Sequence, residues 1–535
     1  MMAEIDKQFN LLDEPWILVR KKGCEIAEVS LTDALLHAHE YDALSGELPT
    51  QDIAILRLLL AVLHTVFSRV DADGNEIMID TDNAVEVWSE LWENGRFPEK
   101  PIRDYLDKWH ERFWLFHPER PFFQANSAKK GTEYTAAKLN GELSESSNKI
   151  RLFPKRVGQS KNEVTFPEAA RWLIYLNGYD DTSSKPKEKG LPSPGAGWLG
   201  KLGLIWAAGD NLFETLMLNL VLLRDAAEPW GENLPVWELD SVQTGERTEI
   251  PQPDNPAALY TLQSRRISLI CENNRVLGYN LLGGDFFDKV NAFCEQLTIW
   301  RPIFDKKNIS GYQPRRHDSS KQFWREFSSV VEKGVESHQP GVVSWIVYLM
   351  ERGALEETFF RRFDIASVQY GDKDFFVNDI FSDSLTFNIG ILTDAGIDCR
   401  ILIENEISRC DKFADIIADF AEDLMKAAGG KPTSLCTFAR EQYYYRIDGA
   451  FRKWMLSVNP SQTQVEREDR REEWRKINLD IICEFGRELA ASQGQAAFIG
   501  RSVEVDKGKT KGRLHYSVPE AQNRFIRRIN HVDKQ

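Results

Sequence analysis

The sequence lacks three features that would indicate a membrane span, secretion or a structural zinc site. It has no apolar run of the roughly 20 residues that span a bilayer, no N-terminal signal pattern and no C-x-x-C pair. The longest apolar stretch, "AILRLLLAVLHTVF", is interrupted by Arg57 and His64. Its seven cysteines are scattered along 535 residues: Cys24, Cys271, Cys294, Cys399, Cys410, Cys436 and Cys483. These observations predict a cytoplasmic protein with reduced thiols, no structural zinc and no membrane partner.

Motifs for catalysis are missing as well. The nine histidines form no H-x-x-x-H or H-E-x-x-H pair, so no metal site of that kind is expected. There is no G-x-S-x-G, and no cysteine has a histidine close by in the sequence to activate it. We therefore expect no catalytic residue, no bound metal and no cofactor, and a protein that is not an enzyme.

The charge is acidic overall but uneven along the chain. The sequence has 67 Lys and Arg against 82 Asp and Glu, a net charge of −15, which argues against tight nucleic-acid binding by the free chain. Residues 149–161 nevertheless carry five basic side chains and no acidic one, and a second basic run extends from Arg501 to Arg513. Each run is either a solvated surface or a local set of phosphate contacts.

The pattern of apolar residues predicts an α+β protein of two domains. Residues 1–365 mix short β-type runs with helices and are expected to form an irregular α/β domain. Residues 366–535 contain four amphipathic patterns, at about 375–392, 413–424, 447–458 and 474–485, which predict a four-helix bundle with a basic C-terminal tail.

One glycine-rich segment, "PSPGAGWLGKLG" (residues 192–203, the glycine loop), resembles a phosphate-binding loop. Gly195, Gly200 and Lys201 fit the G-x-x-x-x-G-K part of a P-loop, but Leu202 stands where Ser or Thr would hold Mg²⁺. The preceding "SSKPKEKGLPSP" is also unsuited to a buried strand. Since glycines let a backbone approach a ligand closely, the loop alternatively faces a DNA minor groove. From the residues alone, a groove-facing loop and a plain flexible connector both remain open.

Four short stretches resemble the CasA family, the large subunit of the type I-E CRISPR surveillance complex Cascade. They are "FNLLDEPWILV", "LRLLLAVLH", "HPERPFFQ" and "SVQYGDKD", beginning at residues 9, 56, 117 and 367, and their order spans nearly the whole chain. The predicted four-helix ending is similar to the family's architecture too.

This resemblance implies a non-catalytic role in RNA-guided antiviral defence. CasA-like subunits recognise the PAM of double-stranded DNA through the minor groove, help to open the duplex for R-loop formation, and dock the helicase–nuclease. The implied partners are guide RNA (crRNA), the other Cascade subunits, PAM-containing DNA and the helicase–nuclease, with one copy of this chain per complex. Two alternatives remain beside it: a nucleotide-binding enzyme that uses the Gly195–Lys201 loop, and a purely structural scaffold.

The resemblance also implies roles for individual residues. The glycine loop would place Gly195, Ala196, Gly197 and Trp198 at the PAM, with Lys201 near the DNA backbone. The loop at residues 150–163 would contact the guide RNA or DNA through Phe153, Lys155, Arg156 and Lys161. Lys289 is the candidate for a lysine that enters the minor groove.

Three features depart from the family pattern. Some relatives carry a C-x-x-C pair suited to zinc, and this chain has none. The wedge that splits the duplex falls on "YLMERGALEE", where Arg352 and Gly353 are the usable residues. Trp198 is bulky for a loop against DNA, so its indole either lies at the groove or packs the base of the loop.

Overall fold

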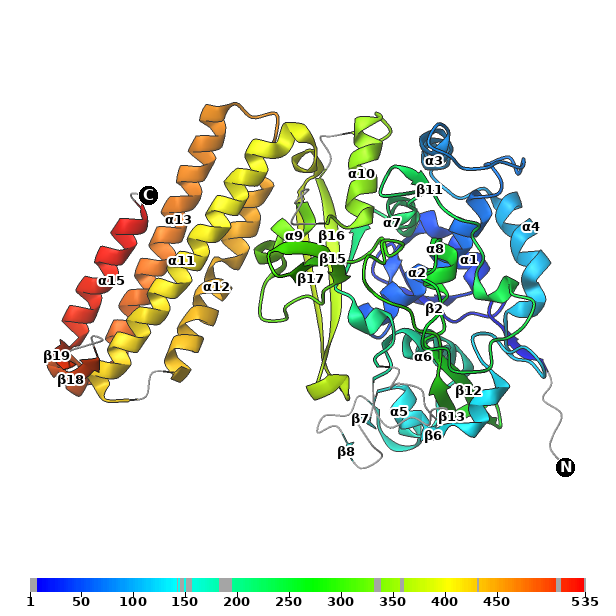
Figure 1. Ribbon diagram of the computed structural model, residues 1–535, viewed down its shortest axis with the longest axis horizontal. Helices are drawn as coiled ribbons and strands as arrows, with labels where there is room; N and C mark the ends of the chain where they lie inside the picture. The colour runs from blue at the N-terminus through cyan, green and yellow to red at the C-terminus, as the bar shows by residue number, and fades with distance from the viewer. Residues whose placement is uncertain are drawn as a thin grey trace. The chain divides into compact units, whose positions relative to one another are not determined.

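The chain forms two compact units (Figure 1). The computed structural model describes residues 7–141, 143–144, 149–150, 156–181, 195–331, 338–356, 360–430, 433–506 and 511–533. The first unit comprises Met1–Phe323, Ser329–Glu356 and Arg361–Ser384, and the second comprises Trp324–Ser328, Glu357–Phe360 and Leu385–Gln535. The expected boundary between residues 365 and 366 falls within strand β16 (Phe360–Tyr370), whereas the units divide after Ser384.

The first unit is built from short helices and small antiparallel sheets. Its helices are α1 (Leu31–Leu36), α2 (Pro49–Phe67), α3 (Ala84–Glu93), α4 (Glu99–Trp109), α5 (Ala136–Leu139), α6 (Phe166–Tyr179), α7 (Leu212–Asn219), α8 (Pro256–Tyr260) and α10 (Gly341–Glu351), and α9 (Ser328–Val331) lies at its boundary. Its two-stranded sheets pair β1 (Gln8–Asn10) with β5 (Trp114–Phe116), β7 (Leu143–Ser144) with β8 (Lys149–Ile150), β10 (Leu223–Arg224) with β11 (Glu228–Pro229), and β14 (Trp300–Asp305) with β15 (Asn308–Pro314). Its three-stranded sheets are β3 (Ile26–Val29), β2 (Ile17–Lys21) and β4 (Tyr41–Leu44); β12 (Arg265–Glu272), β13 (Arg275–Gly283) and β6 (Thr132–Thr135); and β17 (Val377–Asn388), β16 and β9 (Leu204–Ala208), in these orders.

Helix α2 forms the centre of this unit. By length and composition it is the one helix in the described ranges that is apolar enough to cross a membrane, but 94% of it is buried inside the protein. Its two polar interruptions are buried with it: Arg57 is 2% exposed and His64 is 1% exposed. Burial lowers the pKa of His64 to about 3, so this side chain is a neutral histidine of the core.

The helix predicted at 375–392 is wrong, because most of this stretch is a strand. Strand β17 lies beside β16, and only its last residues are buried. Short stretches of mixed apolar and polar residues such as "DIFSDSLTF" do not distinguish helix from strand by period alone, and here the hydrogen bonds to β16 decide the outcome.

The second unit contains the four-helix bundle, with one helix different from those predicted. Helices α11 (Ile397–Ala428), α12 (Thr433–Leu456) and α13 (Gln464–Ala491) coincide with the last three predicted patterns. The fourth helix is α15 (Val518–Asp533), which packs on α11 and α13 and lies in the stretch predicted as a tail. Along the chain, α13 and α15 are joined by the short helix α14 (Gln495–Ile499) and by the hairpin of β18 (Arg501–Asp506) and β19 (Lys511–Tyr516). The predicted α+β class with a C-terminal bundle is confirmed.

Candidate nucleic-acid interface

The glycine loop is anchored directly beside the C-terminal end of α6. Gly195 has a φ of +74°, and its carbonyl oxygen accepts a hydrogen bond from Arg265 Nη2 at 2.6 Å. The amide of Gly197 donates to the carbonyl oxygen of Asp180 at 2.9 Å. Since Arg265 Nε also donates to Asp180 Oδ2 at 2.5 Å, one buried guanidinium holds both the end of α6 and the start of the described loop.

The two glycines at the predicted PAM position face different surroundings. A Cβ on Gly197 would lie 2.3 Å from the carbonyl oxygen of Gly178, which belongs to the α6 backbone. A Cβ on Gly195 would meet nothing within 4 Å. Gly197 is therefore required for close packing, whereas Gly195 adjoins open space.

Trp198 packs the base of the loop, which is the second of the two roles considered for it. Its side chain is 4% exposed, and its ring lies 4.4 Å from that of Phe287, centroid to centroid. The indole Nε1 donates to Glu295 Oε2 at 2.8 Å, and Arg57 donates to both oxygens of the same carboxylate at 2.6 and 2.9 Å. Ala196 is also buried, at 1% exposure. Of the four residues predicted at the PAM, Gly195 alone is not buried.

Two of the predicted lysines lie near enough for their charges to interact, since Lys289 lowers the pKa of Lys201. Lys201 is half-buried, with its Nζ 5.0 Å from the centroid of Phe286, and Lys289 is exposed. Burial lowers the pKa of Lys201 to about 8, and the positive charges of Arg265, Lys289 and Arg316 act in the same direction. An anionic group close to both lysines, such as a phosphate, would stabilise both ammonium groups.

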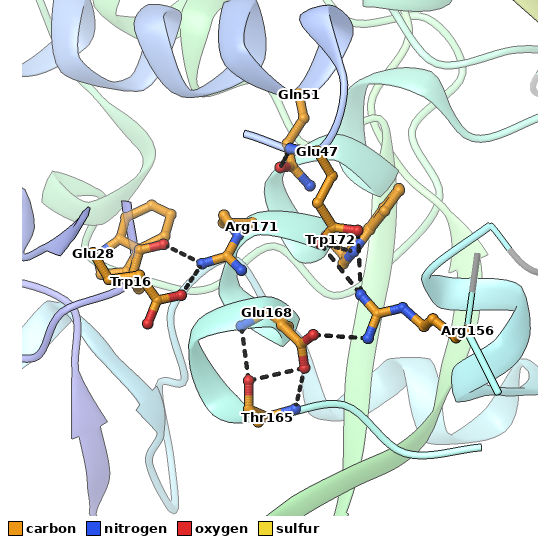
Figure 2. A network of polar contacts seen from close by, with 9 residues as sticks. All are labelled: Trp16, Glu28, Glu47, Gln51, Arg156, Thr165, Glu168, Arg171 and Trp172. Atoms are coloured by element: carbon orange, nitrogen blue, oxygen red, sulfur yellow. Dashed lines mark hydrogen bonds and ion pairs between the residues drawn. The ribbon is translucent and has the colours of Figure 1, made fainter. Parts of the chain in front are cut away.

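Arg156 has a structural use that sequence reasoning missed (Figure 2). Its guanidinium donates to Glu168 Oε1 at 2.7 Å and to both oxygens of Glu47 at 3.2 and 3.3 Å, and its side chain is 15% exposed. Glu168 also completes the capping box of α6, in which Thr165 is the N-cap residue, and Glu47 accepts from Trp172 Nε1 at 3.0 Å. Arg156 thus joins the start of α6 to the segment before α2.

The other members of the predicted RNA-contact loop are placed less fully. Phe153 and Lys155 lie outside the described residues. Lys161 is half-exposed at the end of a single 3-10 turn, Gly158–Lys161. The roles of all three stay predictions.

Replacing Arg156 with Ala is expected to lower the free energy of unfolding by about 1–2 kcal/mol, because two partly buried carboxylates lose their cation. Thermal unfolding of the purified chain measures this change. Lys161→Ala is the control, since Lys161 ends a 3-10 turn of the same loop and forms no ion pair with a described residue, and it should leave the melting temperature within a degree or two. Equal stability of the two variants would show that the Arg156 contacts contribute nothing.

The predicted wedge residues directly follow α10, with Arg352 as its C-cap residue. Gly353 donates to the carbonyl oxygen of Met350 at 2.9 Å, and the Arg352 guanidinium lies 5.0 Å from the centroid of Tyr348 on the same helix. These contacts are local to α10, so the role of Arg352 and Gly353 as a wedge stays a prediction.

The loop does not have the geometry of a P-loop. A P-loop opens a helix whose N-terminus receives the phosphates. Here Leu199–Lys201 form one 3-10 turn, and strand β9 follows at Leu204. Among the residues described, no group of three His, Cys, Asp or Glu is placed to hold a metal ion.

Comparison with known proteins supplies the family. The model of the family described as "CRISPR-associated protein Cse1" matches residues 10–484. The chain belongs to the Cse1 family. It is 27% identical to the CRISPR-associated protein CasA/Cse1 of Thermus thermophilus over 539 aligned positions, covering 96% of this chain and 97% of that protein.

Solved Cse1 structures share the fold along the full chain. The crystal structure of Thermobifida fusca Cse1 matches with a TM-score of 0.82 and 27% identity, covering 100% of this chain and 99% of that one. A chain from a solved "CRISPR RNA-guided surveillance complex" matches with a TM-score of 0.65 over 98% of this chain and 100% of that one, at 14% identity, which shows the fold alone.

Cse1 membership confirms the resemblance drawn from the four short motifs. It assigns no role to single residues, so Gly195, Lys201 and Lys289 stay predictions. The buried residues that hold the loop, Arg57, Arg265 and Glu295, were missed. One signal was present: a lone arginine within an apolar helix requires a buried partner.

Proposed function

We propose that this Cse1-family chain is the non-catalytic large subunit of a type I-E RNA-guided surveillance complex. In that complex it recognises the PAM through the minor groove, helps to start duplex opening, and docks the helicase–nuclease. Its partners are the guide RNA, the other subunits and PAM-containing DNA. Family membership supports the complex as its setting, and one structural neighbour comes from an RNA-guided surveillance complex.

One observation carries the DNA-reading part of this proposal. Gly195 combines a left-handed backbone with open space on its side-chain face, and the same loop carries Lys201, whose ammonium group is also within reach of the charge of Lys289. A bare backbone beside ammonium groups fits a groove whose walls are phosphates. Lys201 and Lys289 then contact the DNA backbone and supply affinity, while the loop approaches the base edges and supplies discrimination.

Replacing Gly195 with Asn tests the loop directly. Asn accepts positive φ better than other non-glycine residues, and nothing within 4 Å opposes its Cβ, so the fold is retained. The new side chain fills the space that the duplex needs. We expect the assembled complex to bind a PAM-containing duplex about tenfold more weakly, a cost of about 1.4 kcal/mol. Titration of labelled duplex against the complex measures this change.

A matched control is Gly23→Asn. Gly23 has a φ of +92° in the turn between β2 and β3 and also has nothing within 4 Å of its Cβ position. This variant should assemble and bind DNA as the unaltered complex does. If Gly195→Asn binds PAM duplex with unchanged affinity, the glycine loop does not face DNA. Saturable ATP binding that is lost in Lys201→Ala would favour the nucleotide alternative instead.

A further inference from the structure

Arg316, just beyond β15, joins the glycine loop to a second segment of the first unit. Its Nε donates to the carbonyl oxygen of Gly200 at 2.6 Å. Its Nη1 and Nη2 donate to Asp374 Oδ1 and Oδ2 at 2.8 and 2.9 Å. All three donors form charge-assisted hydrogen bonds, so this guanidinium fixes two backbone segments relative to each other.

The second segment is the turn between β16 and β17, Gly371–Phe376. Its residues Lys373 and Asp374 both have a φ of +57°, a left-handed conformation that is unfavourable for a non-glycine residue. Within the turn, Gly371 donates to the Phe376 carbonyl at 2.9 Å. The bidentate pair with Arg316 therefore helps to hold a conformation that the turn does not favour by itself.

A third contact ties the same turn to the base of the loop. The Arg316 guanidinium lies 4.7 Å from the centroid of Tyr370, and the Tyr370 hydroxyl donates to the carbonyl oxygen of Tyr179, at the end of α6, at 2.6 Å. A Cβ on Gly200 would come within 2.2 Å of that hydroxyl oxygen. The loop, the turn and α6 thus meet around Gly200.

We propose that Arg316 is a positioning residue for DNA recognition: it fixes the outer end of the glycine loop, Gly200 and Lys201, against the β16–β17 turn. This inference rests on the proposed function of the loop. The inner end, Gly195–Trp198, is held separately by Arg265 and Glu295, so loss of Arg316 releases the outer end alone. Because the Arg316 side chain is 30% exposed, its removal leaves the core intact.

The Arg316–Asp374 pair also acts on the pKa of Lys201. Burial is the main cause that lowers the pKa of this lysine to about 8; Arg265, Lys289 and Arg316 lower it further, and Asp374 raises it. Removing Arg316 therefore raises the pKa of Lys201, whereas removing the charge of Asp374 lowers it. A bound phosphate favours the ammonium form, so duplex affinity falls as the pH rises through this titration.

Arg316→Ala in the assembled complex is the test. We expect about a tenfold loss of affinity for PAM-containing duplex, with assembly unchanged. Arg69→Ala is the matched control. The Arg69 guanidinium donates to both carboxylate oxygens of Glu238, at 2.9 and 3.0 Å, and to the backbone carbonyl oxygen of Asn233. Its side chain is 33% exposed, close to the value for Arg316. If both variants lose affinity equally, Arg316 stabilises the fold only and the inference is wrong.

A pH series distinguishes a positioning role of Arg316 from a general loss of stability. Between pH 6.5 and 9.5, the fall in affinity should begin at higher pH in Arg316→Ala and at lower pH in Asp374→Asn than in the unaltered complex. A purely structural role would weaken both variants without opposite shifts, and that result would overturn the inference. If Gly195→Asn weakens binding while Arg316→Ala does not, only this inference fails; if neither affects binding, the proposed function of the loop fails.

Discussion

Glu295→Gln is expected to lower the free energy of unfolding by about 3–5 kcal/mol. The Glu295 and Arg57 side chains are 0% and 2% exposed, and Arg57 donates to both carboxylate oxygens. Glutamine has the same size but no charge, so it leaves an uncompensated guanidinium in the core. It also presents a single acceptor oxygen where Arg57 and Trp198 now bind two. Urea denaturation, followed by tryptophan fluorescence, measures the loss.

Two controls identify the buried charge as the cause. Glu99→Gln breaks an exposed pair with Arg103, whose side chains are 68% and 49% exposed, and should cost well under 1 kcal/mol. The double variant Arg57→Met with Glu295→Met removes both charges and should recover much of the lost stability. A Glu295→Gln protein as stable as Glu99→Gln would contradict the role assigned to this ion pair.

Gly197→Ala is expected to cost about 2–3 kcal/mol and to abolish PAM binding, because the added methyl group overlaps the α6 backbone. Its Cβ would lie 2.3 Å from the carbonyl oxygen and 2.7 Å from the carbonyl carbon of Gly178. Neither atom belongs to a side chain that rotates away, so the loop must shift and lose its hydrogen bond to Asp180. Thermal unfolding of the chain and duplex titration of the complex measure the two effects.

Gly195→Ala separates packing from DNA contact at this loop. It adds the same methyl group into open space, and only its positive φ opposes the change, at a cost of about 1 kcal/mol. Gly197→Ala should therefore be clearly the less stable of the two. If the two variants have the same melting temperature, the packing of Gly197 on α6 does not constrain the loop.

The sequence predicted the long helices well because each has a strong period of its own. The amphipathic patterns of α11, α12 and α13 needed no information from distant residues. The stretch at 375–392 was predicted as a helix and is mostly strand β17, because its period is ambiguous and β16 lies beside it. The last bundle helix was not predicted, because the basic run from Arg501 to Arg513 suggested a tail from there onward.

The candidate site was predictable in outline only. The sequence gathers Gly195, Gly197 and Lys201 in one loop, but it does not say that Gly197 packs inward while Gly195 adjoins open space. In the same way, Arg156 looks like one of five equal basic residues in the sequence, and the structure uses it to hold Glu47 and Glu168.

Local pattern and motif order by themselves determined the family, the α+β class, three of the four bundle helices and the place of the glycine loop, since each depends on residues close together in the chain. The tertiary structure alone decided which loop residues are free to meet a partner. Arg57 and Glu295 are 238 residues apart, and Trp198 and Glu295 are 97 apart. Such pairs form only when burial brings distant polar groups together, because a buried charge or donor must find its partner wherever the fold places it.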